Sequence, residues 1–122
     1  MEDNIYREQL MELFKNPAYR GHLNNATLTL NANNPMCGDE LIITLAIKDG
    51  VIKDYRYDGE ACAVSLASAE ILGEQIIGEP ITKLISLTKE ELLKLLGVQL
   101  TTSRVKCALL PLETLKDAST QL

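Results

Sequence analysis

The sequence has no tryptophan, one phenylalanine and four tyrosines among its 122 residues, so it offers few aromatic side chains on which nucleic-acid bases could stack. It also lacks an excess of basic residues. Twelve lysines and arginines stand against seventeen aspartates and glutamates, which gives a net charge of -5. Because binding to a phosphate backbone requires clustered positive charge, we expect no nucleic acid partner.

Long apolar runs are missing as well. No stretch approaches the roughly 20 apolar residues of a membrane-spanning helix, and the opening MEDNIYREQL lacks the basic end and apolar core of a signal peptide. Hydrophobic residues make up 46% and charged residues 24%, which is a globular composition. We therefore expect a cytoplasmic protein without a membrane partner. Residues 1–122 are expected to form a single domain, with a monomer as the default state.

The hydrophobic periodicity predicts strands first and helices afterwards, which is an α+β order. The expected elements are a helix over 4–15, strands over 26–33, 41–47 and 51–57, and helices over 62–77, 89–96 and 110–118. Thr88 and Glu91 form a capping-box pattern that opens the helix over 89–96, and Gly97 follows this helix as its stop signal. Pro111 is expected in the first turn of the last helix. The predicted fold is a small antiparallel three-stranded sheet with helices packed on one face.

The hairpin between the second and third strands can be given a register. A two-residue turn at Asp49-Gly50 would place charged residues opposite the apolar face of the second strand. A three-residue loop with a left-handed Gly50 avoids this and is therefore preferred. The pairs that it predicts are Ile47 with Val51, Ile43 with Tyr55, and Leu41 with Tyr57.

Three cysteines, Cys37, Cys62 and Cys107, are the main chemical signal. An odd number in a reducing compartment argues against a disulfide framework and leaves metal binding, catalysis or simple burial. Each cysteine is expected at a junction between elements, and at Cys62 the start of a helix favours the thiolate. Asp39 is the natural carboxylate companion of Cys37. Three thiolates and one carboxylate make four ligands, as a tetrahedral zinc ion requires.

The charged neighbours of the cysteines have two interpretations. Arg104 and Lys106 would favour a thiolate at Cys107, or they are ordinary surface charges. His22, the one histidine, lies in a polar loop sequence and is interpreted as a solvated surface residue. No glycine-rich phosphate loop or dinucleotide-binding motif is present.

The segments around the cysteines are Asn34-Pro-Met-Cys-Gly-Asp39, Gly59-Glu-Ala-Cys-Ala-Val-Ser-Leu-Ala-Ser-Ala69 and Arg104-Val-Lys-Cys-Ala108. They resemble the three signature segments of the U-type iron–sulfur cluster assembly proteins, the IscU, SufU and NifU N-terminal family. The opening, with Tyr6-Arg7 and Phe14-Lys-Asn-Pro17, resembles that family too. The resemblance implies a compact α+β sandwich and a site made of Cys37, Asp39, Cys62 and Cys107. It also implies a transient iron–sulfur cluster or iron at this site, zinc in the resting or purified form, a cysteine desulfurase as partner, and recipient apoproteins or cluster carriers.

The subtype stays open. Lys106 stands where members similar to IscU carry histidine, and this detail resembles SufU. The short stretch between Cys62 and Cys107, however, leaves no room for the insertion that SufU proteins typically carry. Three functions follow as alternatives: a scaffold or carrier for clusters, a zinc-dependent sulfurtransferase that accepts persulfide sulfur on Cys37 or Cys107, and a zinc-stabilised interaction module. Only the second of these is an enzyme.

Overall fold

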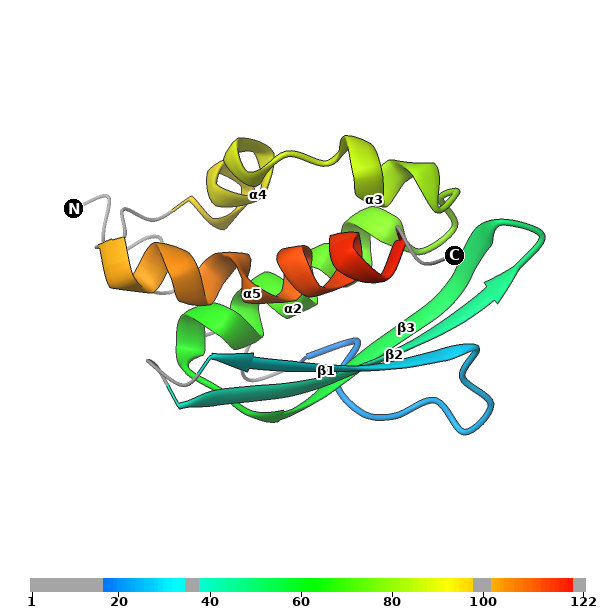
Figure 1. The fold of residues 1–122 in the computed structure, drawn as a ribbon, viewed down its shortest axis with the longest axis horizontal. Coiled ribbons are helices and arrows are strands. Elements are labelled where there is room, and N and C mark those ends of the chain that lie inside the picture. Colours follow the sequence, from blue (N-terminus) through cyan, green and yellow to red (C-terminus); the bar gives the residue numbers. More distant parts are fainter. Residues whose placement is uncertain (1–16, 35–37, 98–101, 120–122) are drawn as a thin grey trace.

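A computed structural model describes residues 17–34, 38–97 and 102–119 of the chain (Figure 1). Three antiparallel strands form one sheet in the order β1-β2-β3. The elements are β1 (Leu28–Asn34), β2 (Asp39–Lys48), β3 (Val51–Glu60), α2 (Ala63–Ile76), α3 (Thr82–Ser86), α4 (Lys89–Leu96) and α5 (Thr102–Ser119). The helix expected over residues 4–15 lies outside the described residues.

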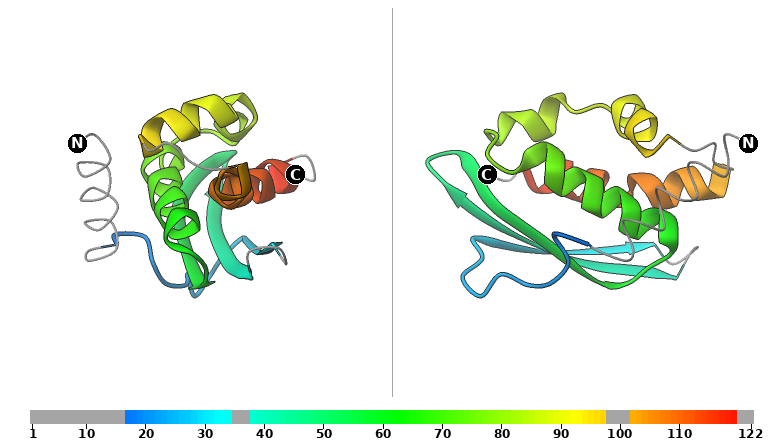
Figure 2. Two further views of the ribbon diagram at one scale, coloured as in Figure 1. Left: turned by 90° about the vertical axis from the view of Figure 1, so that its left-hand side faces the viewer. Right: turned by 180° about the vertical axis from the view of Figure 1, so that it is seen from behind.

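The described helices all lie on one face of the sheet (Figures 1 and 2). Helix α2 packs along β3 and α5 packs along β1, while α3 and α4 lie over these two helices on the side away from the sheet. The sheet turns alternate residues such as Leu41, Ile43 and Leu45 towards the helices, and these are buried. The expected α+β class, with helices on one face of a three-stranded sheet, is therefore confirmed. No helix of the described segments is long and apolar enough to cross a membrane.

The turn between β2 and β3 corrects the expected three-residue loop. Lys48 pairs with Val51, so the turn has two residues, Asp49 and Gly50. Both adopt positive φ, 56° and 75°. Two consecutive left-handed residues form the tight turn whose twist matches that of a hairpin, and Asp-Gly is a favoured sequence for it. The preference of Asp-Gly for a two-residue turn therefore decides the length of this turn, and the expected three-residue loop is wrong.

A β-bulge solves the problem that the two-residue turn creates. The register shifts between Ala46 and Ile47, because Ile47 pairs with Ile52 whereas Ala46 pairs with Asp54, which leaves Lys53 as the extra residue. Lys53 is exposed, so the extra residue costs no apolar burial. Beyond the bulge the core pairs are Leu45 with Tyr55 and Ile43 with Tyr57, in place of the pairs that were expected.

The last helix also differs from its prediction. Helix α5 begins at Thr102 and contains Pro111 in its interior, whereas the proline was expected in the first turn of a helix starting near residue 110. An interior proline removes the hydrogen bond from its own nitrogen to the carbonyl four residues earlier, here that of Cys107. The hydroxyl of Ser65 on α2 donates a hydrogen bond to this carbonyl at 2.9 Å. Packing against α2 thus supplies a donor in place of the N–H that the proline lacks.

Helix α4 forms as its sequence predicts. The Thr88 side chain accepts a hydrogen bond from the backbone N–H of Glu91, and Gly97 ends the helix in the left-handed conformation with φ of 72°. Leu92 and Leu96 on one side of the helix are buried. The Thr88 cap and the left-handed Gly97 fix the two ends of this short helix, and the apolar spacing fixes the side that is buried.

Candidate functional site

Asp39 is the centre of the candidate site. It is the first residue of β2 and is 1% exposed, which is unusual for a carboxylate unless its oxygens are satisfied. Its Oδ1 accepts the backbone N–H of Cys62 at 2.8 Å. Since Cys62 is the residue before the first turn of α2, this bond ties the start of β2 to the start of the helix.

The two described cysteines approach Asp39 from different elements. The Cys62 Sγ lies 3.5 Å from Asp39 Oδ2 and is partly buried. Cys107 comes from α5 and is buried, which corrects the expectation that it lies at a junction between elements, since α5 begins five residues before it. One ligand atom from each of Asp39, Cys62 and Cys107 lies within 4.8 Å of the others. Three segments distant in the sequence therefore meet at one point.

The spacing of these atoms fits a metal ion. Zinc binds sulfur at about 2.3 Å and carboxylate oxygen at about 2.0 Å, so the two ligand atoms of a tetrahedral site lie about 3.5 Å apart. The distance between Cys62 Sγ and Asp39 Oδ2 is 3.5 Å. Two soft sulfurs and one hard oxygen suit zinc or iron better than magnesium or calcium, which prefer oxygen alone.

Ser65 belongs to the site although the sequence does not single it out. Its hydroxyl is buried and donates to Asp39 Oδ2 at 2.6 Å, and its Oγ lies 3.5 Å from Cys62 Sγ. The available signal is a serine three residues after Cys62, which places both on the same side of the first turn of α2. Serines near helix starts are common, and so this spacing alone does not distinguish Ser65.

The other expected site residues are placed as follows. Cys37 and the side chain of Arg104 lie outside the described residues. Lys106 is exposed on α5. His22 is exposed on the surface, as expected, with its Nε2 3.4 Å from Asp58 Oδ2.

A second buried carboxylate, Glu70 of α2, fastens the chain before β1. It accepts the backbone N–H of Ala18 at 2.8 Å, that of Tyr19 at 3.2 Å, and the Tyr57 hydroxyl at 2.9 Å. Burial, together with this hydrogen bond and the charge of Glu70, raises the pKa of Tyr57 above its ordinary value. Burial likewise raises the pKa of Tyr55. These groups keep the tyrosines neutral and play a structural part.

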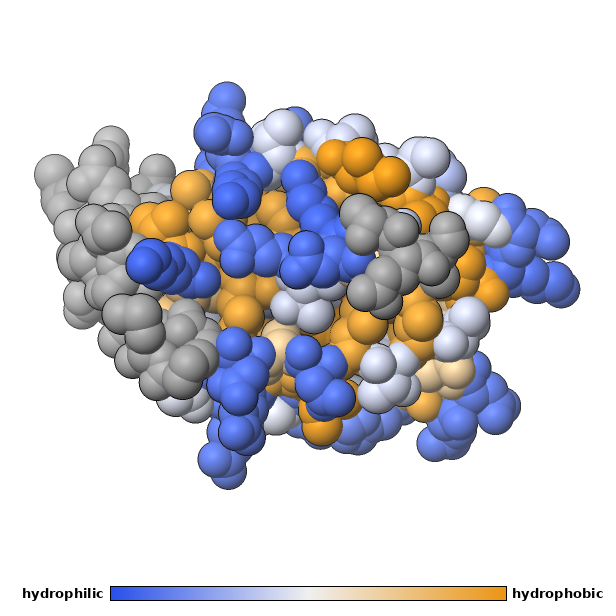
Figure 3. Space-filling model, viewed as in Figure 1, coloured by the Kyte–Doolittle hydropathy of each residue, from blue (hydrophilic) through white to orange (hydrophobic). Residues whose placement is uncertain are grey.

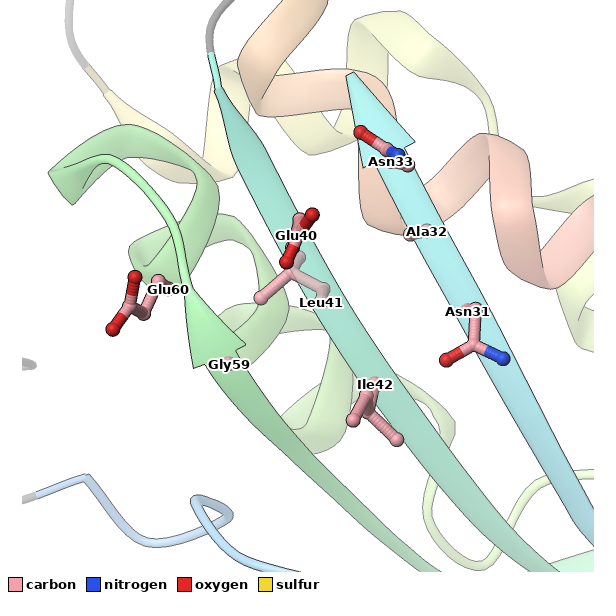
Figure 4. Close-up of a pocket in the computed structure, with 8 residues that line it drawn as sticks. All are labelled: Asn31, Ala32, Asn33, Glu40, Leu41, Ile42, Gly59 and Glu60. Atoms are coloured by element: carbon pink, nitrogen blue, oxygen red, sulfur yellow. The ribbon is translucent and has the colours of Figure 1, made fainter. Parts of the chain in front are cut away.

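A cavity of about 380 Å³ lies on the sheet face opposite to the helices (Figure 4). Its side chains come from all three strands and include Asn31, Glu40, Ile42 and Glu60. Since Asp39 turns towards the helices and Glu40 away from them, this cavity is separate from the candidate metal centre.

The side of the molecule seen in Figure 1, with α5 in front, shows hydrophobic residues between hydrophilic ones (Figure 3). Within the described segments, the large hydrophobic side chains that are clearly exposed are Ile85 of α3 and Leu95 of α4. Single exposed residues of this kind are ordinary on a folded protein and indicate no site by themselves.

Comparison with known proteins gives a consistent result. The family model described as NifU-like N terminal domain matches residues 5–121. The chain is 35% identical to the iron-sulfur cluster assembly scaffold protein IscU of Thermotoga maritima, over 93% of this chain and 92% of that protein. It is 34% identical to the zinc-dependent sulfurtransferase SufU of Bacillus subtilis, over 71% of this chain and 58% of that protein.

Solved structures agree in fold. A protein from Fervidobacterium islandicum, described as an iron-sulfur cluster assembly scaffold protein for the SUF system, superposes with a TM-score of 0.78 at 27% identity, covering 92% of this chain and 94% of that one. The N-terminal part of a NifU-like protein from Brucella abortus also reaches 0.78, covering 98% and 94%, and at 22% identity this likeness concerns the fold alone. The chain therefore belongs to the NifU-like N-terminal domain family, that of the U-type iron–sulfur cluster assembly proteins.

Proposed function

We propose that this protein is an iron–sulfur cluster assembly scaffold that receives sulfur from a cysteine desulfurase, binds iron, and passes the cluster to apoproteins or carriers. The observation that carries this proposal is the convergence of ligand atoms from Asp39, Cys62 and Cys107 within 4.8 Å. The similarity to an IscU scaffold over nearly the whole chain supports it. Cys37, two residues before Asp39, is proposed as the fourth ligand. The scaffold would act as a single-domain cytoplasmic monomer.

Sulfur transfer in this proposal is an exchange between a thiolate and a persulfide. The thiolate of Cys37 or Cys107 attacks the outer sulfur of the desulfurase persulfide, and a new S–S bond forms. The old S–S bond breaks, and its electron pair remains on the desulfurase cysteine as a thiolate. The exchange itself needs no oxidant or reductant, but Cys107 is part of a disulfide in the structure, against the expectation, so a thiol reductant must open that bond before Cys107 can attack. Lys106 and Arg104 are proposed to favour the thiolate form of Cys107.

Asp39 gives the site a ligand that can exchange. A carboxylate is a hard ligand, whereas its neighbours Cys62 and Cys107 are soft, so it holds iron or zinc less firmly than the thiolates do. A scaffold must release its cargo, and a ligand that leaves more easily than the others provides a route for release. Zinc at the same ligands would be the form that is stable in the absence of iron.

A second candidate function is a zinc-dependent sulfurtransferase. The similarity to the SufU protein of Bacillus subtilis favours it, as does the exposed Lys106, since lysine is not among the side chains that commonly bind zinc, whereas histidine is. In this case zinc would stay bound, and the chain would carry a persulfide without building a cluster.

One experiment separates the two functions. The protein is mixed anaerobically with a cysteine desulfurase, cysteine and ferrous iron, and the visible absorption of the purified protein fraction is followed. A scaffold develops thiolate-to-iron charge-transfer bands that stay with the protein and later move to an apo-ferredoxin. A sulfurtransferase accelerates the desulfurase and carries persulfide while its own fraction stays colourless. If neither effect is observed although zinc is bound, the protein acts only as an interaction module, and the proposal is contradicted.

A further inference from the structure

Ser65 lies where three groups of the candidate metal centre meet. Its side chain is completely buried. The Oγ lies 2.6 Å from Asp39 Oδ2 and 2.9 Å from the carbonyl oxygen of Cys107. A hydroxyl carries one proton, so it donates to only one of these two oxygens at a time. The carboxylate and the carbonyl therefore compete for the same proton.

The Cys107 carbonyl takes part in this competition because of Pro111. In a continuous α-helix, the N–H of residue 111 would donate to the carbonyl of residue 107. Proline has no N–H, and the Ser65 hydroxyl of the neighbouring helix donates there instead. The proline inside α5 is thus linked to Asp39 through a single hydroxyl group.

This hydroxyl also bears on the geometry of the metal ligands. Asp39 Oδ2, which accepts from Ser65, is the oxygen that lies 3.5 Å from Cys62 Sγ, at the spacing of two ligands of one ion. Hydrogen-bond partners of ligating carboxylates hold them in orientation, and removing such a partner commonly lowers metal affinity 10- to 100-fold. Because the Ser65 hydroxyl is shared with the Cys107 carbonyl, it holds the Asp39 carboxylate less firmly than a hydroxyl that donates to Asp39 alone.

We propose that Ser65 is a positioning residue of the metal centre and that Pro111 sets its strength. The Ser65 hydroxyl holds Asp39 Oδ2 towards the bound metal. The proline leaves the Cys107 carbonyl as a competing acceptor, which keeps Asp39 a ligand that exchanges easily. This inference rests on the proposed function, because it requires that Asp39, Cys62 and Cys107 bind metal.

Two substitutions should change metal affinity in opposite directions. Ser65→Ala removes the donor, and we expect zinc to bind about 10- to 100-fold more weakly. Pro111→Ala restores an N–H for the Cys107 carbonyl and leaves the Ser65 proton to Asp39 alone, so zinc should bind about two- to tenfold more tightly. Affinity is measured by competition with a chromophoric zinc chelator at constant pH and salt. Since Pro111→Ala favours the helix, it folds even if Ser65→Ala does not.

Ser68 provides a matched control on the same helix. It is also buried, lies one turn after Ser65, and donates to the Ala108 carbonyl of the same partner helix. Ser68→Ala should lower the melting temperature as Ser65→Ala does but leave zinc affinity unchanged. In an Asp39→Ala background, the effects of Ser65→Ala and Pro111→Ala on zinc affinity should both vanish, because both act through Asp39.

The outcomes separate this inference from the proposed function. If the wild-type protein binds no zinc, the proposed metal centre is wrong and the inference falls with it. If the wild-type protein binds zinc but Ser65→Ala and Ser68→Ala change its affinity equally, Ser65 has only a structural part and the inference alone is overturned. Effects that persist without Asp39, or a Pro111→Ala variant that binds zinc more weakly, overturn it as well.

Discussion

The Oδ1 atom of Asp39 accepts the backbone N–H of Cys62 at 2.8 Å across 23 residues of sequence. This single bond joins the first residue of β2 to the residue that precedes α2. It satisfies one of the N–H groups that a helix start leaves without a partner inside the helix. It also leaves the other oxygen, Oδ2, beside the Cys62 sulfur. One side chain thus serves both the fold and the candidate metal centre.

Because Asp39 has both a structural and a ligand role, Asp39→Asn and Asp39→Ala should differ in their free energies of unfolding. The asparagine keeps an oxygen that accepts from Cys62, so its free energy of unfolding should stay close to wild type. The alanine leaves the Cys62 N–H and the Ser65 hydroxyl without this acceptor, and we expect a loss of about 1–3 kcal/mol. Both variants lose the negative ligand and should bind zinc more weakly. Urea unfolding in chelator and zinc competition check this, and an asparagine variant with wild-type zinc affinity would contradict it.

Zinc should stabilise the folded protein by mass action. A ligand that binds only the folded state adds about 2.7 kcal/mol when its free concentration is 100 times its dissociation constant. We expect the melting temperature to rise with added zinc and to fall after chelation, while the metal-free protein remains folded. The Cys62→Ser and Cys107→Ser double variant should show no zinc-dependent change. Equal shifts in this variant and in the wild type would place the zinc elsewhere.

The buried tyrosine beside Glu70 predicts a loss of stability at high pH. Burial, with Glu70 as hydrogen-bond partner and negative neighbour, raises the pKa of Tyr57 above its value of 10.0 in an unfolded chain. The stabilisation of a group whose folded pKa is raised is complete below the unfolded pKa and is lost as the pH rises through the folded one. The free energy of unfolding should therefore fall above about pH 10, by up to about 1.4 kcal/mol per pH unit for one tyrosine.

Tyr57→Phe isolates this contribution from the other titrating groups. At pH 8 the variant should be less stable than wild type, since it lacks the hydrogen bond to Glu70. Above pH 10 the difference should narrow, because the phenylalanine has no proton to lose. Unfolding in urea between pH 8 and pH 11 tests this. Two curves that stay parallel over the whole range would show that folding does not raise the pKa of Tyr57 and would contradict the prediction.

The strands and α4 were predictable because their signals are local. Alternation of apolar residues in β1 and β2 requires only the period of a strand, and the Thr88 cap and Gly97 stop lie within the helix that they define. The hairpin register was not predictable in the same way. Lys53 is the exposed extra residue of the bulge, and a lysine in a strand sequence does not indicate that the alternation of β3 shifts at that position.

The site shows the same limit at longer range. Pro111 carries the local signal of a helix start, yet α5 continues through it, and the Cys107 carbonyl that loses its usual N–H donor lies beside the Ser65 hydroxyl of another helix. The meeting of Asp39 with Cys62 and Cys107 was expected from the family resemblance, since spacing in sequence alone does not bring them together. The part of Ser65 depends on contacts between three elements, and only the structure shows it.

Gly59 provides the final prediction, because it lies near the end of β3, three residues before Cys62 at the start of α2. Its φ is 125°, and a Cβ at this position would lie 2.2 Å from the carbonyl oxygen of Glu40 on the adjacent strand. Both atoms belong to backbone or are fixed to it, so relief requires β2 and β3 to separate next to Asp39. Backbone strain alone costs about 1–3 kcal/mol. We expect Gly59→Ala to lower the free energy of unfolding by more than this, because the clash adds to the strain, and to weaken zinc binding.

Gly78→Ala is the control that separates strain from contact. Gly78 also has a positive φ, 86°, but nothing lies within 4 Å of the Cβ that alanine would add. The free energy of unfolding that Gly78→Ala loses should therefore reflect backbone strain only, and the zinc affinity of this variant should equal that of wild type. Urea unfolding in chelator measures both losses. If the two variants lose the same free energy and bind zinc alike, the close approach of β2 to Gly59 does not hold the metal centre in place.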